Sequence, residues 1–203
     1  MSFVNWLTVN PASGSGNGTV NVSGSTYTGR VMRQTVIEVT AANVTPAQVT
    51  VKQSGKSEFV TSNANSYTKE KEGGTLTIEG VSNSSALTFS LGTGDLDITL
   101  PASYTANGET TANGDPITGD PGAAAQYNWS IQFTIPSATT VETKSKQLTI
   151  TDDGGHSVTV TINLTGVDAY LTVSESEITI PADGTAQSFT ITSNVSWTID
   201  SAS

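Results

Sequence analysis

The 203-residue chain contains no cysteine, a single histidine (His156) and few charged side chains, which make up 13% of its residues. The lack of cysteine excludes disulfides, thiolate metal sites and cysteine nucleophiles. The sequence also lacks a Gly-x-Ser-x-Gly element, a phosphate-binding P-loop and a dinucleotide-binding fingerprint. We therefore expect a protein that is not an enzyme and that uses no cofactor.

The remaining polar side chains predict no catalytic or metal site. His156 follows Asp-Asp-Gly-Gly in an expected hairpin turn, where a solvated polar residue is usual. Asp95 and Asp97 would share one face of a strand, but acid–base catalysis needs a pocket as well as a pair of carboxylates. Other carboxylates in expected loops lack the spacing of a known calcium loop; these are Asp115, Asp120, Asp152 and Asp153.

Long apolar stretches are also missing. No run is long enough to cross a membrane, and the start of the chain has neither the basic nor the apolar region of a signal peptide. If Met1 is the natural start, we expect the chain to be released soluble into the cytoplasm in which it is made. The net charge of −10 and the pI near 4.3 repel phosphate backbones, so we expect neither nucleic acid nor a membrane as partner.

What the sequence does contain is a repeated alternation of apolar residues with threonine or another polar residue, the pattern of strands buried on one face. These predicted strands are 19–22, 35–39, 48–51, 75–78, 96–100, 130–135, 147–150, 158–162, 177–180 and 188–191. Gly, Pro and Asn-Gly or Asp-Gly turns separate them, and no segment has helical periodicity. The pattern predicts an all-β fold of tandem immunoglobulin-like β-sandwiches.

One stretch departs from this pattern. Residues 102–125 are rich in Gly, Ala, Asn, Asp and Pro and show little alternation. We expect a long exposed loop there, and long loops on rigid sandwiches often carry function.

Aromatic residues raise the question of sugar binding, because exposed rings stack on pyranose faces. Trp129 and Trp197 share the parity of apolar neighbours in their strands and are expected to point inward. Trp6 has the parity of Thr8, which places it at a boundary. The candidate ligand-binding residues are therefore Trp6, together with Tyr104 and Tyr127 near the predicted loop.

Both ends of the chain resemble parts of BACON modules, which are immunoglobulin-like domains of Bacteroidetes proteins and their phages. Residues 6–20 (WLTVNPASGSGNGTV), 33–40 (RQTVIEVT) and 49–55 (VTVKQSG) resemble the later strands of such a module. Its opening strands resemble residues 178–184 (ITIPADG), 189–194 (FTITSN) and 195–199 (VSWTI). The opening strands thus lie at the C-terminal end of the chain and the later strands at its N-terminal end.

This order predicts three parts: residues 1–54 with the later strands, a central immunoglobulin-like domain over 55–166 that includes the loop 102–125, and residues 167–203 with the opening strands. The central part resembles the family more weakly. Three arrangements explain the split: the two ends of one chain close one module, the C-terminal half completes the N-terminal half of a neighbouring subunit, or the sequence is cut between modules. An unpaired half-sandwich would expose open edges and an apolar face.

The resemblance implies a structural virion protein of a Bacteroidetes-infecting phage, as capsid decoration or auxiliary protein, or as a head-fibre or tail component. Its expected partners are other virion proteins, with the major capsid protein foremost, or copies of itself, and its module loops would touch glycans. The alternative is a carbohydrate-binding or spacer module of a secreted or cell-surface polysaccharide-processing protein. The expected location is accordingly the virion surface, after synthesis in the host cytoplasm, or the outside of the cell.

Overall fold

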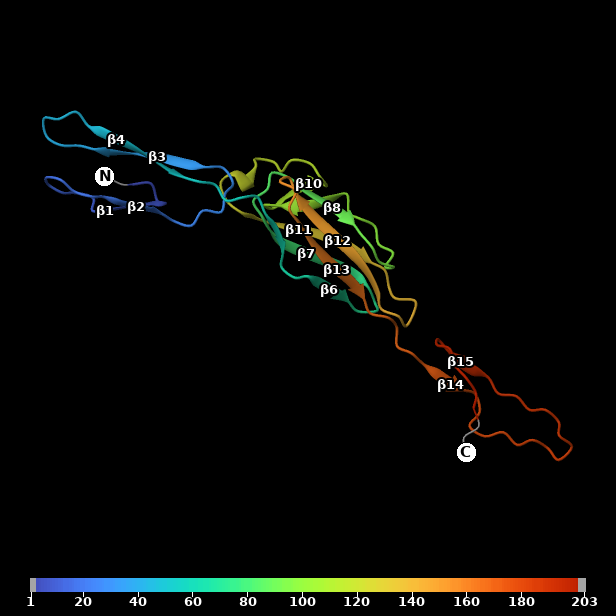
Figure 1. Cartoon of the computed structure of the whole chain (residues 1–203). Helices are drawn as coiled ribbons and strands as arrows, with labels where there is room; N and C mark the ends of the chain where they lie inside the picture. Colours follow the sequence, from blue (N-terminus) through green and yellow to red (C-terminus); the bar gives the residue numbers. More distant parts are fainter. Residues whose placement is uncertain (1–2, 201–203) are drawn as a thin grey trace.

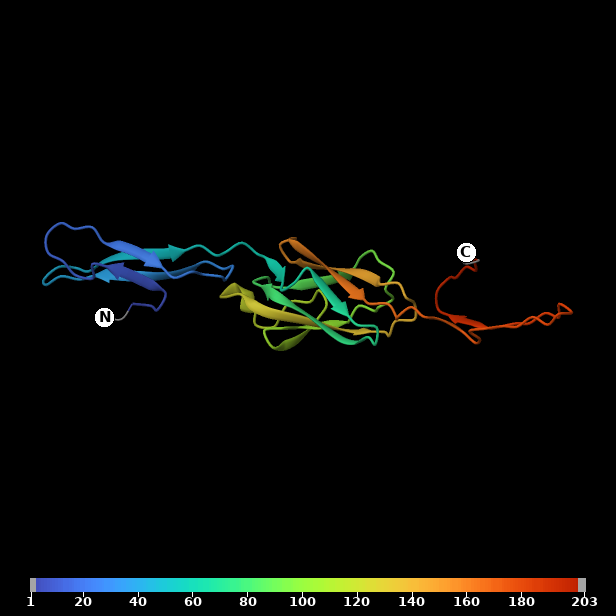
Figure 2. The same cartoon turned by 90° about the horizontal axis from the view of Figure 1, so that it is seen from below.

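The computed structural model describes residues 3–200 and is an elongated, three-part molecule (Figure 1). A sandwich in the middle separates two slender terminal segments that extend from its opposite ends, and a view from below shows the same separation (Figure 2). Over the described residues, the regular structure is strands and one short 3-10 turn, η1 (Pro121–Ala123). The all-β prediction is confirmed.

The central sandwich consists of a five-stranded and a four-stranded sheet. In the five-stranded sheet the order is β10 (Glu109–Ala112), β9 (Ser103–Ala106), β11 (Tyr127–Ile135), β7 (Gly74–Ser82) and β5 (Val60–Ser62). In the four-stranded sheet it is β6 (Ser66–Lys69), β13 (Ser157–Leu164), β12 (Lys144–Asp152) and β8 (Leu87–Leu91).

This strand order is that of an immunoglobulin domain. Strands β5, β7, β11 and β9 take the places of A, B, E and D, and β8, β12 and β13 take those of C, F and G. The first strand switches sheets, because β5 pairs antiparallel with β7 whereas β6 pairs parallel with β13. The central segment therefore forms a complete sandwich by itself.

In each long strand of the sandwich every second side chain points into the core, as the alternating sequence predicts. In β11 the buried residues are Tyr127, Trp129, Ile131, Phe133 and Ile135, and the residues between them are partly or fully exposed. Phe89 packs edge-on against Trp129, with ring centroids 5.5 Å apart. Trp129 is 2% exposed and thus points inward, as predicted.

The prediction of an exposed loop over 102–125 is wrong for residues 103–112, whereas residues 113–120 do form a loop. Strands β9 and β10 form a hairpin on the edge of the five-stranded sheet, closed by Asn107 and Gly108, which both have positive φ, as a two-residue hairpin turn requires. Alanine, asparagine and glycine have low strand propensity, which concealed the alternation of this segment. After the hairpin, Ile117 is buried and η1 follows.

The N-terminal segment consists of two separate hairpins. β1 (Leu7–Asn10) pairs with β2 (Asn21–Gly24), and β3 (Arg33–Val39) pairs with β4 (Ala47–Gln53). The two-stranded sheets do not hydrogen-bond to each other as one sheet. Instead their inner faces meet at one end, where a Cβ on Gly24 would lie 3.0 Å from the side chain of Gln53. The segment is therefore half of a sandwich.

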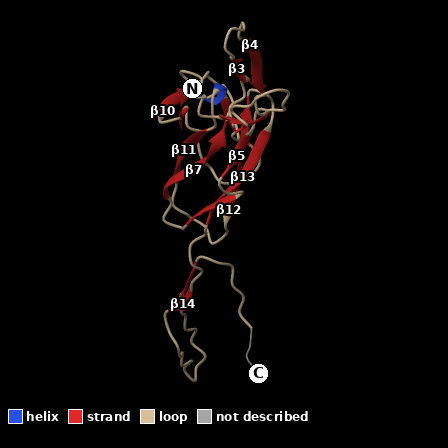
Figure 3. Ribbon diagram, turned by 90° about the vertical axis from the view of Figure 1, so that its left-hand side faces the viewer, coloured by secondary structure: helices blue, strands red, loops and turns tan. Residues whose placement is uncertain are grey.

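The C-terminal segment has still less regular structure. β14 (Leu171–Val173) and β15 (Ile191–Ser193) form a short hairpin that projects away from the sandwich (Figure 3). The predicted strands 177–180 and 96–100 are not formed, since neither stretch has a ladder partner in the described chain. Leu96 and Ile98 are nevertheless buried in the sandwich, whereas Ile178 and Ile180 are exposed.

Candidate binding surfaces at the two ends of the chain

The N-terminal half-sandwich carries a stack of three side chains at its inner end. The guanidinium of Arg33 lies 4.6 Å from the ring centroid of Trp6 and 4.2 Å from that of Tyr27. Arg33 is held there by hydrogen bonds that it donates to Gln53 Oε1 (2.9 Å) and to the backbone oxygen of Ser25. Trp6 is half-buried, so part of its ring remains open to a ligand while one face is covered by a cation.

The other two candidate ligand residues are buried in the sandwich core. Tyr104 is 3% exposed and its hydroxyl accepts a hydrogen bond from the backbone N–H of Leu87, while Tyr127 is 4% exposed and its hydroxyl donates to the backbone oxygen of Ser84. Burial raises the pKa of both hydroxyls. The expectation that these two rings are displayed is wrong, because both lie on the inward face of their strands.

Beyond the stack, the inner faces of the N-terminal hairpins are left uncovered. Cross-strand partners on these faces include Val9 with Val22, and Ile37 with Val49. Val22 is still 41% exposed and Val49 54% exposed. In the whole described part of this segment, only Leu7 and Gly29 are buried. Apart from Leu7 and the stack around Arg33, the side chains on the facing sides of the two sheets are thus only partly covered.

The C-terminal segment exposes apolar side chains along its whole length. No residue from 167 to 200 is buried. Trp197 was expected to point inward but is 48% exposed, and Phe189 is 43% exposed. Because Val195, Trp197 and Ile199 alternate with polar residues, this stretch has the pattern of a strand with an apolar face but has no ladder partner.

Exposed large apolar side chains are confined to these two segments in the described chain. All eighteen lie at positions 3–49 or 170–199, and the central sandwich contributes none. They are Phe3, Val4, Val20, Val22, Val31, Met32, Val36, Val39, Val44, Val49, Tyr170, Leu171, Val173, Ile178, Ile180, Phe189, Trp197 and Ile199. Such a concentration marks interaction surfaces, because soluble monomers expose large apolar side chains singly.

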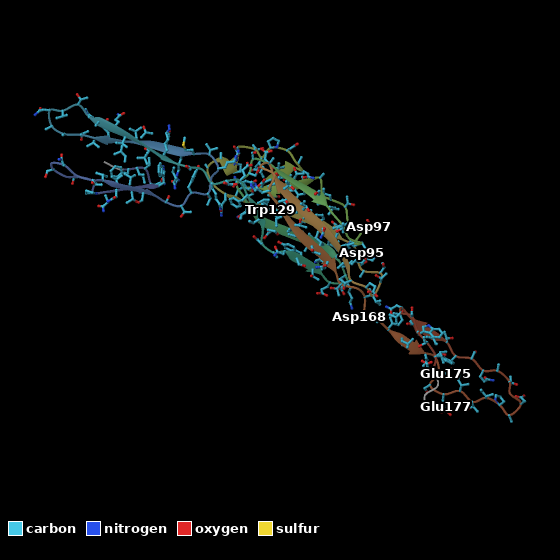
Figure 4. All side chains as sticks on the ribbon, in the orientation of Figure 1. Asp95, Asp97, Trp129, Asp168, Glu175 and Glu177 are labelled. Atoms are coloured by element: carbon cyan, nitrogen blue, oxygen red, sulfur yellow. The ribbon has the colours of Figure 1, made fainter. Side chains whose placement is uncertain are left out.

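The two terminal segments also differ in charge. Residues 1–54 carry Arg30, Arg33, Lys52 and Glu38, a net charge of +2. Residues 167–203 contain no Lys or Arg and have a net charge of −5. Their acidic residues are Asp168, Glu175, Glu177, Asp183 and Asp200, and Figure 4 shows Asp168, Glu175 and Glu177 along the segment.

A polar joint fixes the N-terminal half-sandwich to the central one. Arg30 donates hydrogen bonds to both carboxylate oxygens of Asp120, at 2.6 Å for Nη1 to Oδ1, and its Nε lies 3.4 Å from Glu58 Oε1. The hydrogen bond to Asp120 raises the pKa of the Arg30 guanidinium. The fully buried Asn83 donates to the backbone oxygen of Thr28 from the other side of the joint.

The joint between the central sandwich and the C-terminal segment has fewer polar contacts. Lys71 forms an exposed ion pair with Asp168, and the backbone N–H of Val167 donates to the oxygen of Thr140 at 2.9 Å. The hydrogen bond to Asp168 raises the pKa of Lys71. An exposed pair of this kind contributes little stability, so this joint holds its segment less firmly than the arginine joint does.

The polar side chains that could serve in catalysis or metal binding lie apart from both surfaces. His156 lies in the turn between β12 and β13, as predicted, and its Nδ1 is 3.1 Å from the buried carboxylate of Asp152. Asp95 and Asp97 are exposed on an edge of the sandwich (Figure 4). Within residues 3–200 no three His, Asp or Glu side chains gather in a way that would hold a metal ion, and no helix there is long and apolar enough to cross a membrane.

Comparison with known proteins finds a family model that matches the N-terminal segment. Residues 1–54 match the family model of the BACON domain, which is described as a putative binding domain. The match confirms the resemblance for that segment. No curated protein matches the chain.

Among solved structures, the chain is similar to two endo-fucoidan hydrolases of glycoside hydrolase family 107. One has a TM-score of 0.33 at 13% identity, over 82% of this chain and 23% of the hydrolase, and the other 0.29 at 16% identity, over 81% and 26%. The chain thus spans about a quarter of each hydrolase.

Proposed function

We propose that this chain is a non-enzymatic structural protein that carries an immunoglobulin-like sandwich between two cohesive ends, on the surface of a virion of a Bacteroidetes-infecting phage. In this role it decorates the capsid or forms part of a head fibre or tail, with virion proteins such as the major capsid protein, or further copies of itself, as partners. The proposed place of action is the particle surface.

The observation that carries the proposal is the distribution of exposed apolar side chains. The central sandwich buries its own core, and the described chain exposes large apolar residues solely in the terminal segments. A protein built in this way gains stability when its ends associate, because burial of apolar surface stabilises by about 25 cal/mol per Å². Cohesion, with the sandwich as a rigid spacer, is the function that this geometry serves.

Immunogold labelling tests the proposed location. An antibody against the central sandwich is applied to purified particles of the phage that encodes the chain, and to the host cells. Label on the capsid or tail is the expected result, and a mass spectrum of washed particles should contain peptides of this chain. Label that is absent from particles and present on the surface of cells that carry the gene would overturn the virion assignment in favour of a cell-surface protein.

A second candidate is carbohydrate binding by the N-terminal segment. It is favoured by the part-exposed ring of Trp6 and by the match of residues 1–54 to a putative binding domain. Titration calorimetry with a panel of polysaccharides should then give binding heat that is lost in Trp6→Ala. The heat should be retained in Trp129→Phe, because Trp129 is buried in the sandwich core, at 2% exposure. No heat from the unchanged chain would remove this candidate.

A further inference from the structure

We infer that the C-terminal segment of one chain completes the N-terminal half-sandwich of a second copy, so that copies join head to tail. The inference rests on the proposed cohesive function and names its partner. The segment that binds is residues 171–199 of the neighbour, and the site that receives it is the incompletely covered inner faces of the β1–β2 and β3–β4 hairpins.

The first support is the open strand edges of both terminal segments. β1, β2, β3 and β4 each pair on one side alone, so every strand of the half-sandwich has an open edge. The C-terminal segment offers partners for these edges: the hairpin β14–β15 and the unpaired stretches 177–180 and 195–199. Together the two sets give eight extended stretches. This number falls in the range of seven to nine strands that an immunoglobulin-like sandwich contains.

The second support is the separation of these ends within one chain. The half-sandwich and the C-terminal hairpin lie at opposite ends of the central sandwich (Figures 1 and 2). The arginine joint and the folded sandwich between them prevent the two halves of one chain from meeting in this conformation. A second molecule placed along the same axis brings its C-terminal segment to the first one's N-terminal hairpins.

The third support is complementarity of charge and apolar area. Residues 1–54 have a net charge of +2 and residues 167–203 have a net charge of −5. This difference favours pairing of unlike ends over pairing of two C-terminal ends. A fully buried non-aromatic apolar side chain removes roughly 60–120 Å² from water and an aromatic one roughly 150–250 Å². With half of each exposed, the fourteen non-aromatic and four aromatic side chains offer about 1,000 Å² as an upper figure. That is close to the apolar share of a standard interface of about 1,600 Å².

The contact is heterologous, because the two surfaces that meet are different parts of the chain. Each copy that joins leaves one donor segment and one receiving half-sandwich open, so association continues until a ring closes or a filament grows. The angle between successive copies decides which of these forms. An isologous two-fold dimer is not expected.

Blocked variants of the whole chain test the inference. The double variant Val22→Asp, Val49→Asp places charges on the receiving faces, and Trp197→Asp, Ile199→Asp places them on the donor segment. Each variant alone should be monomeric by light scattering at concentrations where the unchanged chain associates. Mixed in equal amounts they should form one heterodimer and nothing larger, because the first retains its donor and the second retains its receiving site.

Two controls keep the outcome interpretable. The matched double variant Thr50→Asp, Thr198→Asp places the same charges on the opposite faces of the same stretches and should associate like the unchanged chain. Amide exchange of buried residues of the central sandwich, for example Ile131 and Val160, should be the same in every variant. A mixture that stays monomeric although the sandwich is folded would overturn the head-to-tail contact, and so would blocked variants that each associate alone. Neither result would affect immunogold labelling of particles, so the two proposals fail separately.

Discussion

Trp197 is the side chain whose removal should weaken the contact between copies most. Its ring is the largest of the exposed apolar groups in the donor segment and is 48% exposed. A tryptophan presents up to about 250 Å², so the exposed part amounts to about 100 Å². At about 25 cal/mol per Å² its burial contributes about 2.5 kcal/mol, and Trp197→Ala should raise the Kd between copies roughly 60-fold.

The assay is sedimentation equilibrium of Trp197→Ala beside Thr198→Ala. Thr198 lies next to the ring in sequence but has the opposite parity, so its substitution should change the Kd by less than about threefold. Unfolding of the central sandwich should be unaffected by either change, since no residue from 167 to 200 is buried in it. Equal affinities for the two variants would refute the assignment of Trp197 to the interior of the joined sandwich.

Three further predictions concern the sandwich, the arginine joint and the charged ends. Gly80→Ala should lower the free energy of unfolding of the sandwich by about 1–3 kcal/mol in a denaturant titration, because a Cβ there would lie 1.9 Å from the oxygen of Thr61 and 2.6 Å from the Trp129 ring. The control is Gly18→Ala, which has open space around it, and equal stability of the two variants would contradict the packing described. Arg30→Ala should speed amide exchange of residues 30 and 31 about tenfold, because their N–H groups donate hydrogen bonds to carbonyl oxygens of η1 across the joint that Arg30 stabilises. Unchanged exchange would show that the joint does not depend on the ion pair. Raising the salt concentration from about 20 to 500 mM should slow association of the copies about tenfold in stopped flow, because salt screens the oppositely charged ends. An association rate that does not depend on salt would exclude steering by these charges.

Strand periodicity was sufficient to predict most of the sandwich. The alternation in 130–135 and 158–162 depends on burial of one face, a local property, and both stretches are strands. The turn at His156 was likewise readable from Asp153, Gly154 and Gly155, the last of which has a positive φ of 86°. Strand pairing across long separations, such as β6 beside β13, leaves no comparable local signal.

The candidate ligand residues were predicted less well. Tyr127 has the same parity as Trp129 and Ile131, so the alternation that placed Trp129 inward also applied to Tyr127. The composition of the preceding stretch concealed this, and the Asn107-Gly108 turn was the available sign of the β9–β10 hairpin. The Arg30–Asp120 contact joins residues 90 positions apart and required the folded structure.

Trp197 shows the opposite kind of disagreement. Its parity predicts an inward side chain, yet the ring is 48% exposed in the single chain. A sequence pattern records the environment in which a residue is finally buried, and that environment includes a partner when strands are exchanged between copies. The disagreement between pattern and exposure is therefore what the head-to-tail contact explains.

The central claim is tested most directly by the mass of the unchanged chain measured by light scattering over a wide range of concentration. The account predicts a mass that rises above the 20.9 kDa of one chain as concentration increases, toward a fixed multiple for a ring or without limit for a filament. A chain that stays at the mass of one copy throughout, with its sandwich folded, would contradict it.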